Sequence, residues 1–165
     1  MKRNHIGCLF WGPVGTGKSY IAGCIANELL KQEVTVKMTN FNTIIDDIFP
    51  LADKTEYINA LASYQLLIID DLGVERNSEY ALGIIFSVID CRIRSGRPLI
   101  ITTNLSLKEI KSETMLDKRR IYDRILEMCT PMYVGGASKR EAIASMKMEK
   151  AKTLLNTNRG EEKCE

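Results

Sequence analysis

The sequence predicts an α/β fold in three layers, with a mostly parallel five-stranded sheet between helices. Short apolar runs alternate along the chain with longer segments whose apolar residues recur at helical spacing. The run at 66–69 is Leu-Leu-Ile-Ile, with no alternating polar residue, which is typical of a parallel strand buried on both faces. A chain of 165 residues suits a single domain with a core of its own.

An apolar run predicts the first strand over 6–11, and helical spacing after a glycine-rich turn predicts a helix over 18–31. A second strand is expected over 35–39, where apolar and polar residues alternate weakly. Two helices, over 41–51 and 57–64, occupy the segment before the next apolar run. The order of strands and helices is the one that right-handed crossovers between parallel strands produce.

The third strand is the apolar run over 66–69. Ser78 can cap a long helix over 79–95, because its apolar residues are spaced for one helix face. Gly-Arg-Pro at 96–98 ends this helix, and Leu-Ile-Ile-Thr-Thr at 99–103 predicts a fourth buried strand.

The rest of the chain continues the same alternation. Ser-Leu-Lys-Glu at 106–109 is a capping-box sequence that begins a short helix. A further helix is expected over 117–128, a short last strand over 131–134 and a basic helix over 138–155. The predicted organisation is one domain, 1–155, and a disordered tail, 156–165.

Composition excludes several classes of protein. A formal net charge of +2 is too small to indicate a nucleic-acid partner by itself. The five cysteines form no CxxC pair and the chain has one histidine, so neither a disulfide framework nor a zinc site is expected. The apolar run after the basic N-terminus is interrupted at Gly12 and Pro13, too early for a signal peptide or a membrane span. We therefore expect a soluble cytoplasmic protein without membrane contact.

The segment from Gly12 to Ser19 fits the phosphate-binding pattern GxxxxGK[ST]. It lies between a predicted strand and a predicted helix, so this interpretation is favoured over a chance glycine-rich turn. Curled backbone N–H groups would bind phosphate oxygens, Lys18 would reach the β- and γ-phosphates, and Ser19 would ligate magnesium. The residues expected to contact the nucleotide are Gly12, Pro13, Val14, Gly15, Thr16, Gly17, Lys18, Ser19 and Tyr20.

Hydrolysis of a bound triphosphate also requires a positioned magnesium ion and an activated water. Asp70 follows a buried strand, so its carboxylate is placed to hold the magnesium, while Asp71 could polarise the water. The alternative is an acidic surface turn before Gly73. Asn104 follows the next strand and is a candidate to contact the γ-phosphate, although a turn or helix cap would suit it equally well.

Arg120 and Arg124 lie four residues apart and share one face of the predicted helix over 117–128. Most arginines in such a position are solvated surface charges. A guanidinium can also neutralise the charge that develops on a transferring phosphoryl group, often from a neighbouring subunit.

Taken in their order along the chain, these motifs resemble those of the AAA+ ATPases. More narrowly, the chain resembles the bacterial replicative helicase loaders of the DnaC/DnaI type and the IstB-type transposition helper ATPases. The resemblance implies a P-loop fold of the AAA+ type without a separate lid domain, with ATP and Mg²⁺ as ligands. It makes Asn104 a sensor, Arg124 an arginine finger that acts in trans beside Arg120, and Arg140 a second sensor. The segments that carry the resemblance are 12–19, 66–73, 102–104, 120–125 and 138–140.

The resemblance also implies a function: slow ATP hydrolysis stimulated by assembly or DNA, oligomers in the ATP state, binding of single-stranded DNA, and help in loading the replicative helicase. Two features of the sequence depart from the pattern of this family. Asp71 stands where many AAA+ proteins carry glutamate, which makes Glu75 an alternative base. Few residues precede the first strand, whereas loaders usually carry an N-terminal region that binds the helicase.

Three other functions fit parts of the sequence. One is a transposition helper ATPase that acts with a transposase on duplex DNA, and another is a nucleotide-binding module that does not hydrolyse. A small-molecule kinase is the third, but the chain shows neither an arginine-rich lid nor a substrate pocket.

Residues that would contact DNA are harder to identify. Arg76 and Lys108 flank the carboxyl ends of strands and are candidates to contact DNA phosphates. The last predicted helix is basic but carries acids as well, so a solvated helix face explains it better. The sequence shows no aromatic stacking platform of the type that single-strand binders use. The basic residues of the last helix are Lys139, Arg140, Lys147, Lys150 and Lys152.

Overall fold

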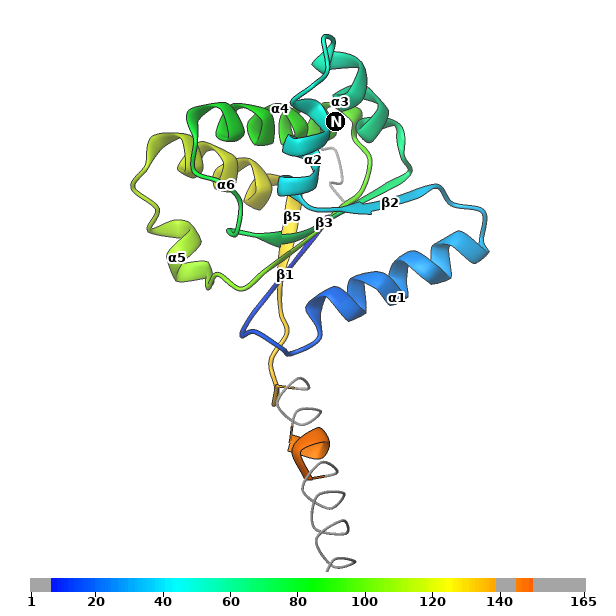
Figure 1. The fold of residues 1–165 in the computed structure, drawn as a ribbon, viewed down its shortest axis with the longest axis vertical. Helices are drawn as coiled ribbons and strands as arrows, with labels where there is room; N and C mark the ends of the chain where they lie inside the picture. Colours follow the sequence, from blue (N-terminus) through cyan, green and yellow to red (C-terminus); the bar gives the residue numbers. More distant parts are fainter. Residues whose placement is uncertain (1–6, 139–144, 150–165) are drawn as a thin grey trace, which may run out of the picture.

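Five parallel strands form one sheet in the order β2-β3-β4-β1-β5 (Figure 1). The computed structural model describes residues 7–138 and 145–149. All four pairings of the sheet are parallel, which confirms the predicted fold class. The strands are β1 (Gly7–Trp11), β2 (Val36–Thr39), β3 (Leu66–Leu72), β4 (Leu99–Thr103) and β5 (Cys129–Tyr133).

Helices cover both faces of this sheet. Figure 1 shows α1 on one face and α2, α3, α4 and α6 on the other. No helix in the part of the chain that the structure describes is both long and apolar enough to cross a membrane. The helices are α1 (Lys18–Lys31), α2 (Phe41–Ile48), α3 (Lys54–Ser63), α4 (Glu79–Ser95), α5 (Leu107–Lys111) and α6 (Leu116–Met128).

The two cores explain why β3 is continuously apolar. Successive side chains of a strand point to opposite faces, so the run supplies both cores. Leu67 and Ile69 belong to the larger core under α2, α4 and α6. Ile68 belongs to the smaller core, where it packs with Ala22 and Ala26 of α1. The three predicted layers are therefore present.

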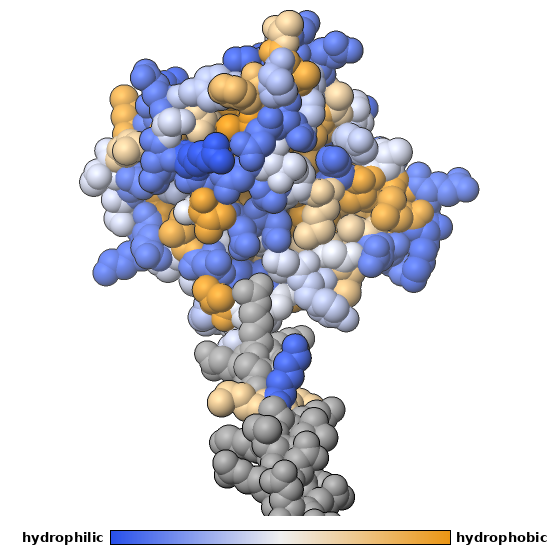
Figure 2. All heavy atoms as spheres, viewed as in Figure 1, coloured by the Kyte–Doolittle hydropathy of each residue, from blue (hydrophilic) through white to orange (hydrophobic). Residues whose placement is uncertain are grey.

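Part of the surface over α1 and β2 is apolar as well. Figure 2 shows apolar side chains on this side of the molecule, and Leu30 and Met38 are exposed there. The smaller core thus lies under one helix, with apolar residues at its margin.

Some boundaries differ from those expected. α3 begins at Lys54, before the expected 57, because the Asp53 side chain caps it by accepting from the N–H groups of Thr55 and Glu56. β3 extends through both acidic residues, and β5 begins as soon as α6 ends. Of the helix expected over 138–155, residues 145–149 are helical, and 139–144 and 150–165 lie outside the described residues.

Candidate nucleotide site

The loop between β1 and α1 curls tightly against the segment that follows β5. Gly12 and Gly15 have φ values of 146° and 83°, which side-chain-bearing residues rarely adopt. A Cβ at Gly12 would overlap the carbonyl oxygen of Val134, and one at Gly15 would overlap the Ser138 hydroxyl. Glycine is therefore required at both positions by backbone conformation and by space.

Lys18 lies inside this loop. Its side chain is 5% exposed, and its ammonium donates to the carbonyl oxygens of Gly12 and Pro13 at 2.8 and 2.7 Å. Thr16 closes the turn with a hydroxyl that donates to the Pro13 carbonyl at 3.0 Å. The loop thus encloses a cation at the carboxyl end of the sheet, as a phosphate-binding loop requires.

The N-terminus of α1 differs from those of the four helices that follow it. Side chains of Asn40, Asp53, Ser78 and Ser106 cap α2, α3, α4 and α5. α1 begins after Gly17 with no side-chain cap and no acidic residue in its first turn. The first N–H groups of a helix have no intrahelical partner and favour an anion. This end of α1 suits a phosphate group.

The remaining residues of the predicted nucleotide set lie on the same loop and helix. Ser19 is half-buried in the first turn of α1. Val14 and Tyr20 are 59% and 69% exposed, so they lie at the rim of the site.

β3 carries a bulge at its two acidic residues. Ile69 pairs with Ile101, but Leu72 pairs with Thr103, so β3 has one residue more than β4 over this stretch. Asp71 takes a φ of 57°, in the left-handed region that aspartate tolerates better than most residues. Bulges re-aim side chains and often lie beside active sites.

Thr102 joins the two acids. Its hydroxyl donates to Asp70 Oδ1 at 2.5 Å and accepts from the N–H of Asp71 at 2.9 Å. Asp70 and Thr102 each lie two residues after an isoleucine of the α1 core, Ile68 and Ile100. Their side chains therefore face the side of the sheet on which α1 packs. Sequence reasoning missed Thr102, although a hydroxyl in a buried strand was the available signal.

Asn104 lies beside Asp71. Its side-chain amide donates to Asp71 Oδ1 at 3.5 Å, and Asn104 is exposed while Asp71 is half-buried.

Glu75, the alternative base, is 9% exposed and accepts from the N–H of Gly73 at 2.6 Å. Burial, and less strongly the Glu75 carboxylate, raise the pKa of Tyr122 to about 12. Glu75 thus serves to close the turn after β3.

The structure does not bring Arg124 to the phosphate loop of its own chain. Arg124 lies on α6, on the sheet face opposite α1, and forms ion pairs with Asp90 at 3.8 Å and Glu127 at 3.3 Å. Arg120 lies one turn earlier, with its guanidinium 5.2 Å from the centre of the Phe86 ring. Both arginines therefore contact residues of α4 and α6 rather than the phosphate loop.

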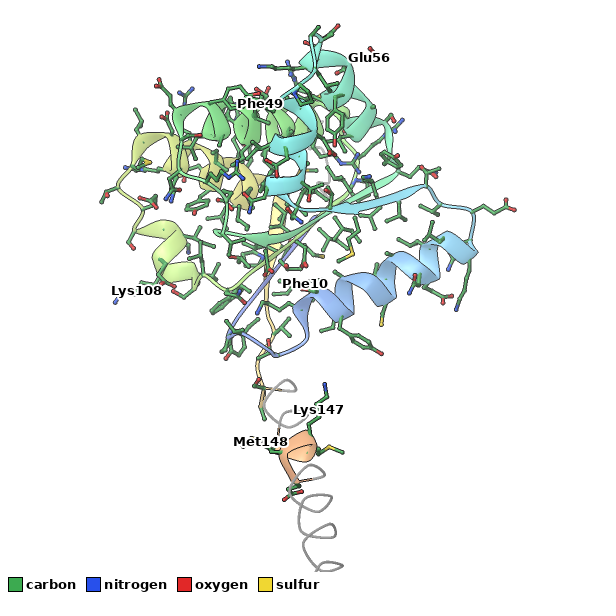
Figure 3. All side chains as sticks on the ribbon, viewed as in Figure 1. Phe10, Phe49, Glu56, Lys108, Lys147 and Met148 are labelled. Atoms are coloured by element: carbon green, nitrogen blue, oxygen red, sulfur yellow. The ribbon has the colours of Figure 1, made fainter. Side chains whose placement is uncertain are left out.

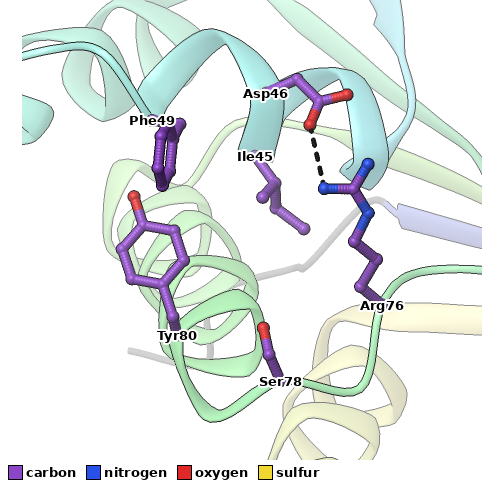
Figure 4. Close-up of a pocket in the computed structure, with 6 residues that line it drawn as sticks. All are labelled: Ile45, Asp46, Phe49, Arg76, Ser78 and Tyr80. Carbon is purple, nitrogen blue, oxygen red and sulfur yellow. Dashed lines mark ion pairs between the residues drawn. The ribbon is translucent and has the colours of Figure 1, made fainter.

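A groove of about 310 Å³ lies between α2 and the start of α4 (Figure 4). The rings of Phe49 and Tyr80 meet edge to face in it, with centroids 6.2 Å apart. Phe49 is 74% exposed, and the Lys54 ammonium lies 4.5 Å from the centre of the Tyr80 ring. The sequence pattern did not indicate this aromatic pair, because the two residues lie 31 positions apart in sequence and meet only in the fold.

The same groove contains one of the two basic residues expected to contact DNA. Arg76 lines it and pairs with Asp46 at 3.4 Å (Figure 4). Lys108 lies elsewhere, since it projects from α5 on a different side of the molecule from Phe49 (Figure 3). Lys147 belongs to the helical segment 145–149. The other basic residues predicted for DNA, and the second sensor, lie outside the described residues: Lys139, Arg140, Lys150 and Lys152.

Comparisons with known proteins identify relatives of this chain. Residues 2–147 match the family described as IstB-like ATP binding protein. The replicative helicase loader DnaC of Escherichia coli (strain K12) is 34% identical over 122 residues, which are 71% of this chain and 49% of that protein. The chain therefore spans about half the length of this curated relative.

Solved structures share the fold. A crystal structure of DnaI aligns with a TM-score of 0.69 at 23% identity, over 82% of this chain and 74% of that one. The replication initiator DnaA, bound to AMPPCP and single-stranded DNA, aligns with a TM-score of 0.67 at 17% identity, over 88% of this chain and 46% of that one.

Proposed function

The chain belongs to the IstB-like ATP binding protein family, and on that premise we propose that it is the ATP-binding and ATP-hydrolysing module of a replicative helicase loader. Its likeness to DnaC, DnaI and DnaA confirms the AAA+ type of P-loop fold that the sequence predicts. The observation that carries the proposal is the phosphate loop, with Lys18 enclosed in it and the uncapped end of α1 beside it.

The residues present fit a magnesium–triphosphate ligand. Lys18 would exchange its two carbonyl acceptors for β- and γ-phosphate oxygens, which are stronger acceptors because they are charged. Ser19 and Asp70 offer the oxygen ligands that magnesium prefers. When bound with the nucleotide, magnesium neutralises charge on the phosphate oxygens.

Each acidic and polar residue at the end of the sheet then has a separate role. Thr102 holds the Asp70 carboxylate in place from the neighbouring strand. Asp71 accepts a proton from the attacking water, and Asn104 orients that water from the next strand. Arg124 of an adjacent subunit would stabilise the charge on the transferring phosphoryl group, which makes assembly a condition for turnover.

The groove between α2 and α4 favours single-stranded DNA as the second ligand. Exposed aromatic rings can stack on unpaired bases, and nearby cations attract the phosphate backbone. Phe49 and Tyr80 supply the rings, while Lys54 and Arg76 supply the cations. Bases stacked inside a duplex are not available to such rings, so the groove favours a helicase loader over a transposition helper on duplex DNA. The DnaA neighbour was solved with single-stranded DNA.

Calorimetric titration with Mg·ATP tests the first part of the proposal. Lys18→Ala should weaken binding by roughly ten- to a hundredfold, because hydrogen bonds to a charged group are lost. Lys31→Ala, at the other end of the same helix and with a side chain that is 74% exposed, serves as the matched control and should bind normally. Equal affinities for wild type and Lys18→Ala would contradict the assignment of the loop.

Fluorescence anisotropy with single-stranded and duplex oligonucleotides tests the second part. Phe49→Ala should weaken single-strand binding by roughly five- to a hundredfold, the range expected for one stacked base. Leu30→Ala, which removes an exposed apolar side chain on the other face of the sheet, should have no effect. A preference for duplex DNA would instead support the transposition helper.

A further inference from the structure

Two carboxylates from different helices flank the guanidinium of Arg124. Glu127, three residues later on α6, has its Oε2 3.3 Å from Arg124 Nη1. Asp90 comes from α4, and its Oδ1 lies 3.8 Å from Arg124 Nη2. Asp90 also pairs with Arg94 on its own helix at 3.3 Å. The side chain of Arg124 is 42% exposed and that of Asp90 is 25% exposed, so the pair lies at the surface with the acid the deeper of the two.

We propose that Asp90 is a positioning residue, which fixes the direction in which Arg124 leaves α6 toward the nucleotide of the neighbouring subunit. The inference rests on the proposed function, in which Arg124 acts in trans. Glu127 lies on the same helix as Arg124, so its ion pair does not connect the arginine to another element. Asp90 ties it to α4, the helix on which α6 packs.

The geometry leaves the arginine able to bind phosphate. Arg124 Nη1 donates a hydrogen bond to Glu127, whereas the contact with Asp90 is an ion pair longer than a hydrogen bond. A guanidinium has five N–H donors in a planar fork. Asp90 therefore orients the charge, and most of the donors stay available for phosphate oxygens.

Stabilisation of the fold does not explain the pair. Ion pairs at this exposure contribute little to the free energy of unfolding. A long flexible side chain that is already oriented loses less freedom on reaching the transition state, and this advantage appears in kcat. Asp90→Asn should therefore lower kcat about three- to tenfold, leave KM for ATP unchanged and leave the melting temperature close to that of wild type.

Mixing two inactive variants separates positioning from a general structural effect. A Lys18→Ala chain keeps Arg124 but lacks the lysine of its phosphate loop. An Arg124→Ala chain keeps that lysine but lacks the arginine. Their mixture should recover ATP turnover at interfaces where the first donates an arginine to the second. Asp90→Asn placed on the Lys18→Ala chain should reduce the recovered turnover three- to tenfold. On the Arg124→Ala chain it should change nothing, since that chain has no arginine to orient.

Two further variants complete the test. Asp90→Glu keeps the carboxylate and should restore most of the lost kcat. Arg94→Gln breaks the other ion pair of Asp90 without touching Arg124, and should leave kcat at the wild-type value. Equal loss of turnover from Asp90→Asn on either chain, or no loss on either, overturns the inference. Failure of the mixture to recover any turnover overturns the trans role of Arg124 itself, which is a failure of the proposed function.

Discussion

The hydroxyl of Thr102 is the polar group that connects the two acidic residues of the candidate site. It is fully buried, donates to the Asp70 carboxylate and accepts from the backbone of Asp71. A threonine thus fixes both the direction of one carboxylate and the bulge that carries the other. The positions of Asp70 and Asp71 therefore depend on Thr102 of β4 as well as on β3, the strand that carries them.

Thr102→Val keeps the shape of the side chain and removes its hydroxyl. The N–H of Asp71 and one Asp70 oxygen then lose a buried partner, so the free energy of unfolding should fall by about 1–3 kcal/mol. ATP turnover should fall while ATP affinity is retained, because the phosphate loop is untouched. Urea denaturation and steady-state kinetics measure the two effects. Thr102→Ser retains the hydroxyl and should resemble wild type in both.

The identity of the base can be decided between Asp71 and Glu75. Asp71 is half-buried beside Asn104, whereas the Glu75 carboxylate is occupied by the N–H of Gly73. Asp71→Asn preserves the size of the side chain and its tolerance of positive φ, and should reduce kcat by on the order of a hundredfold or more. Glu75→Gln should reduce kcat far less and mainly loosen the turn after β3. The reverse order in steady-state rates would make Glu75 the base.

Between elements, a buried arginine joins α3, α4 and β4. Arg92 is fully buried in α4, and its guanidinium donates to four carbonyl oxygens with no carboxylate among these partners. Burial lowers its pKa to about 10, which leaves it charged at neutral pH. The Arg92 guanidinium thus supplies hydrogen-bond donors to carbonyl oxygens at the end of α3 and just before β4, where the chain turns. The four acceptors are those of Ala62, Tyr64, Gln65 and Pro98.

Removing this side chain should be costly. Arg92→Ala leaves a cavity and several buried acceptors without donors, so the free energy of unfolding should fall by at least about 3 kcal/mol. Arg92→Lys keeps the charge but offers three donors in another geometry, and an intermediate loss is expected. Arg94→Ala, two residues along and 71% exposed, is the control and should change stability by less than about 0.5 kcal/mol. Chemical denaturation of the three variants would show whether Arg92 has this role.

For the molecule as a whole, the proposed function requires an arginine from a second subunit. The phosphate loop, Asp70, Asp71 and Asn104 lie along the carboxyl edge of the sheet, where ligands of open α/β sheets bind. Arg124 lies across the sheet from them, on α6. An arrangement in which one face supplies the nucleotide and another the arginine produces head-to-tail contacts, which close into rings or continue as spirals.

Turnover per chain should therefore rise with protein concentration until assembly is complete. Arg124→Ala should lower kcat on the order of a thousandfold, while calorimetry detects unchanged ATP affinity. Steady-state rates over a range of chain concentrations, with light scattering in parallel, would measure both. A rate per chain that is independent of concentration would mean that each subunit hydrolyses ATP alone.

Local patterns in the sequence determined the order of strands and helices, the parallel sheet and the phosphate loop. These features follow from periodicity, glycine positions and a contiguous motif, all of which act over a few residues. The position of Asp70 and Asp71 near the carboxyl end of β3 follows from the same kind of pattern, because both acids come directly after a recognisable apolar run.

The tertiary structure alone decided which distant side chains meet. The Thr102 bridge to Asp70, the Arg92 contacts with α3 and the Phe49–Tyr80 groove each join residues about thirty positions apart. No local pattern specifies such contacts, because they depend on how the twisted sheet and its crossover helices bring separate elements together. The bulge at Asp71 and the carboxylates around Arg124 arise in the same way, from packing between elements.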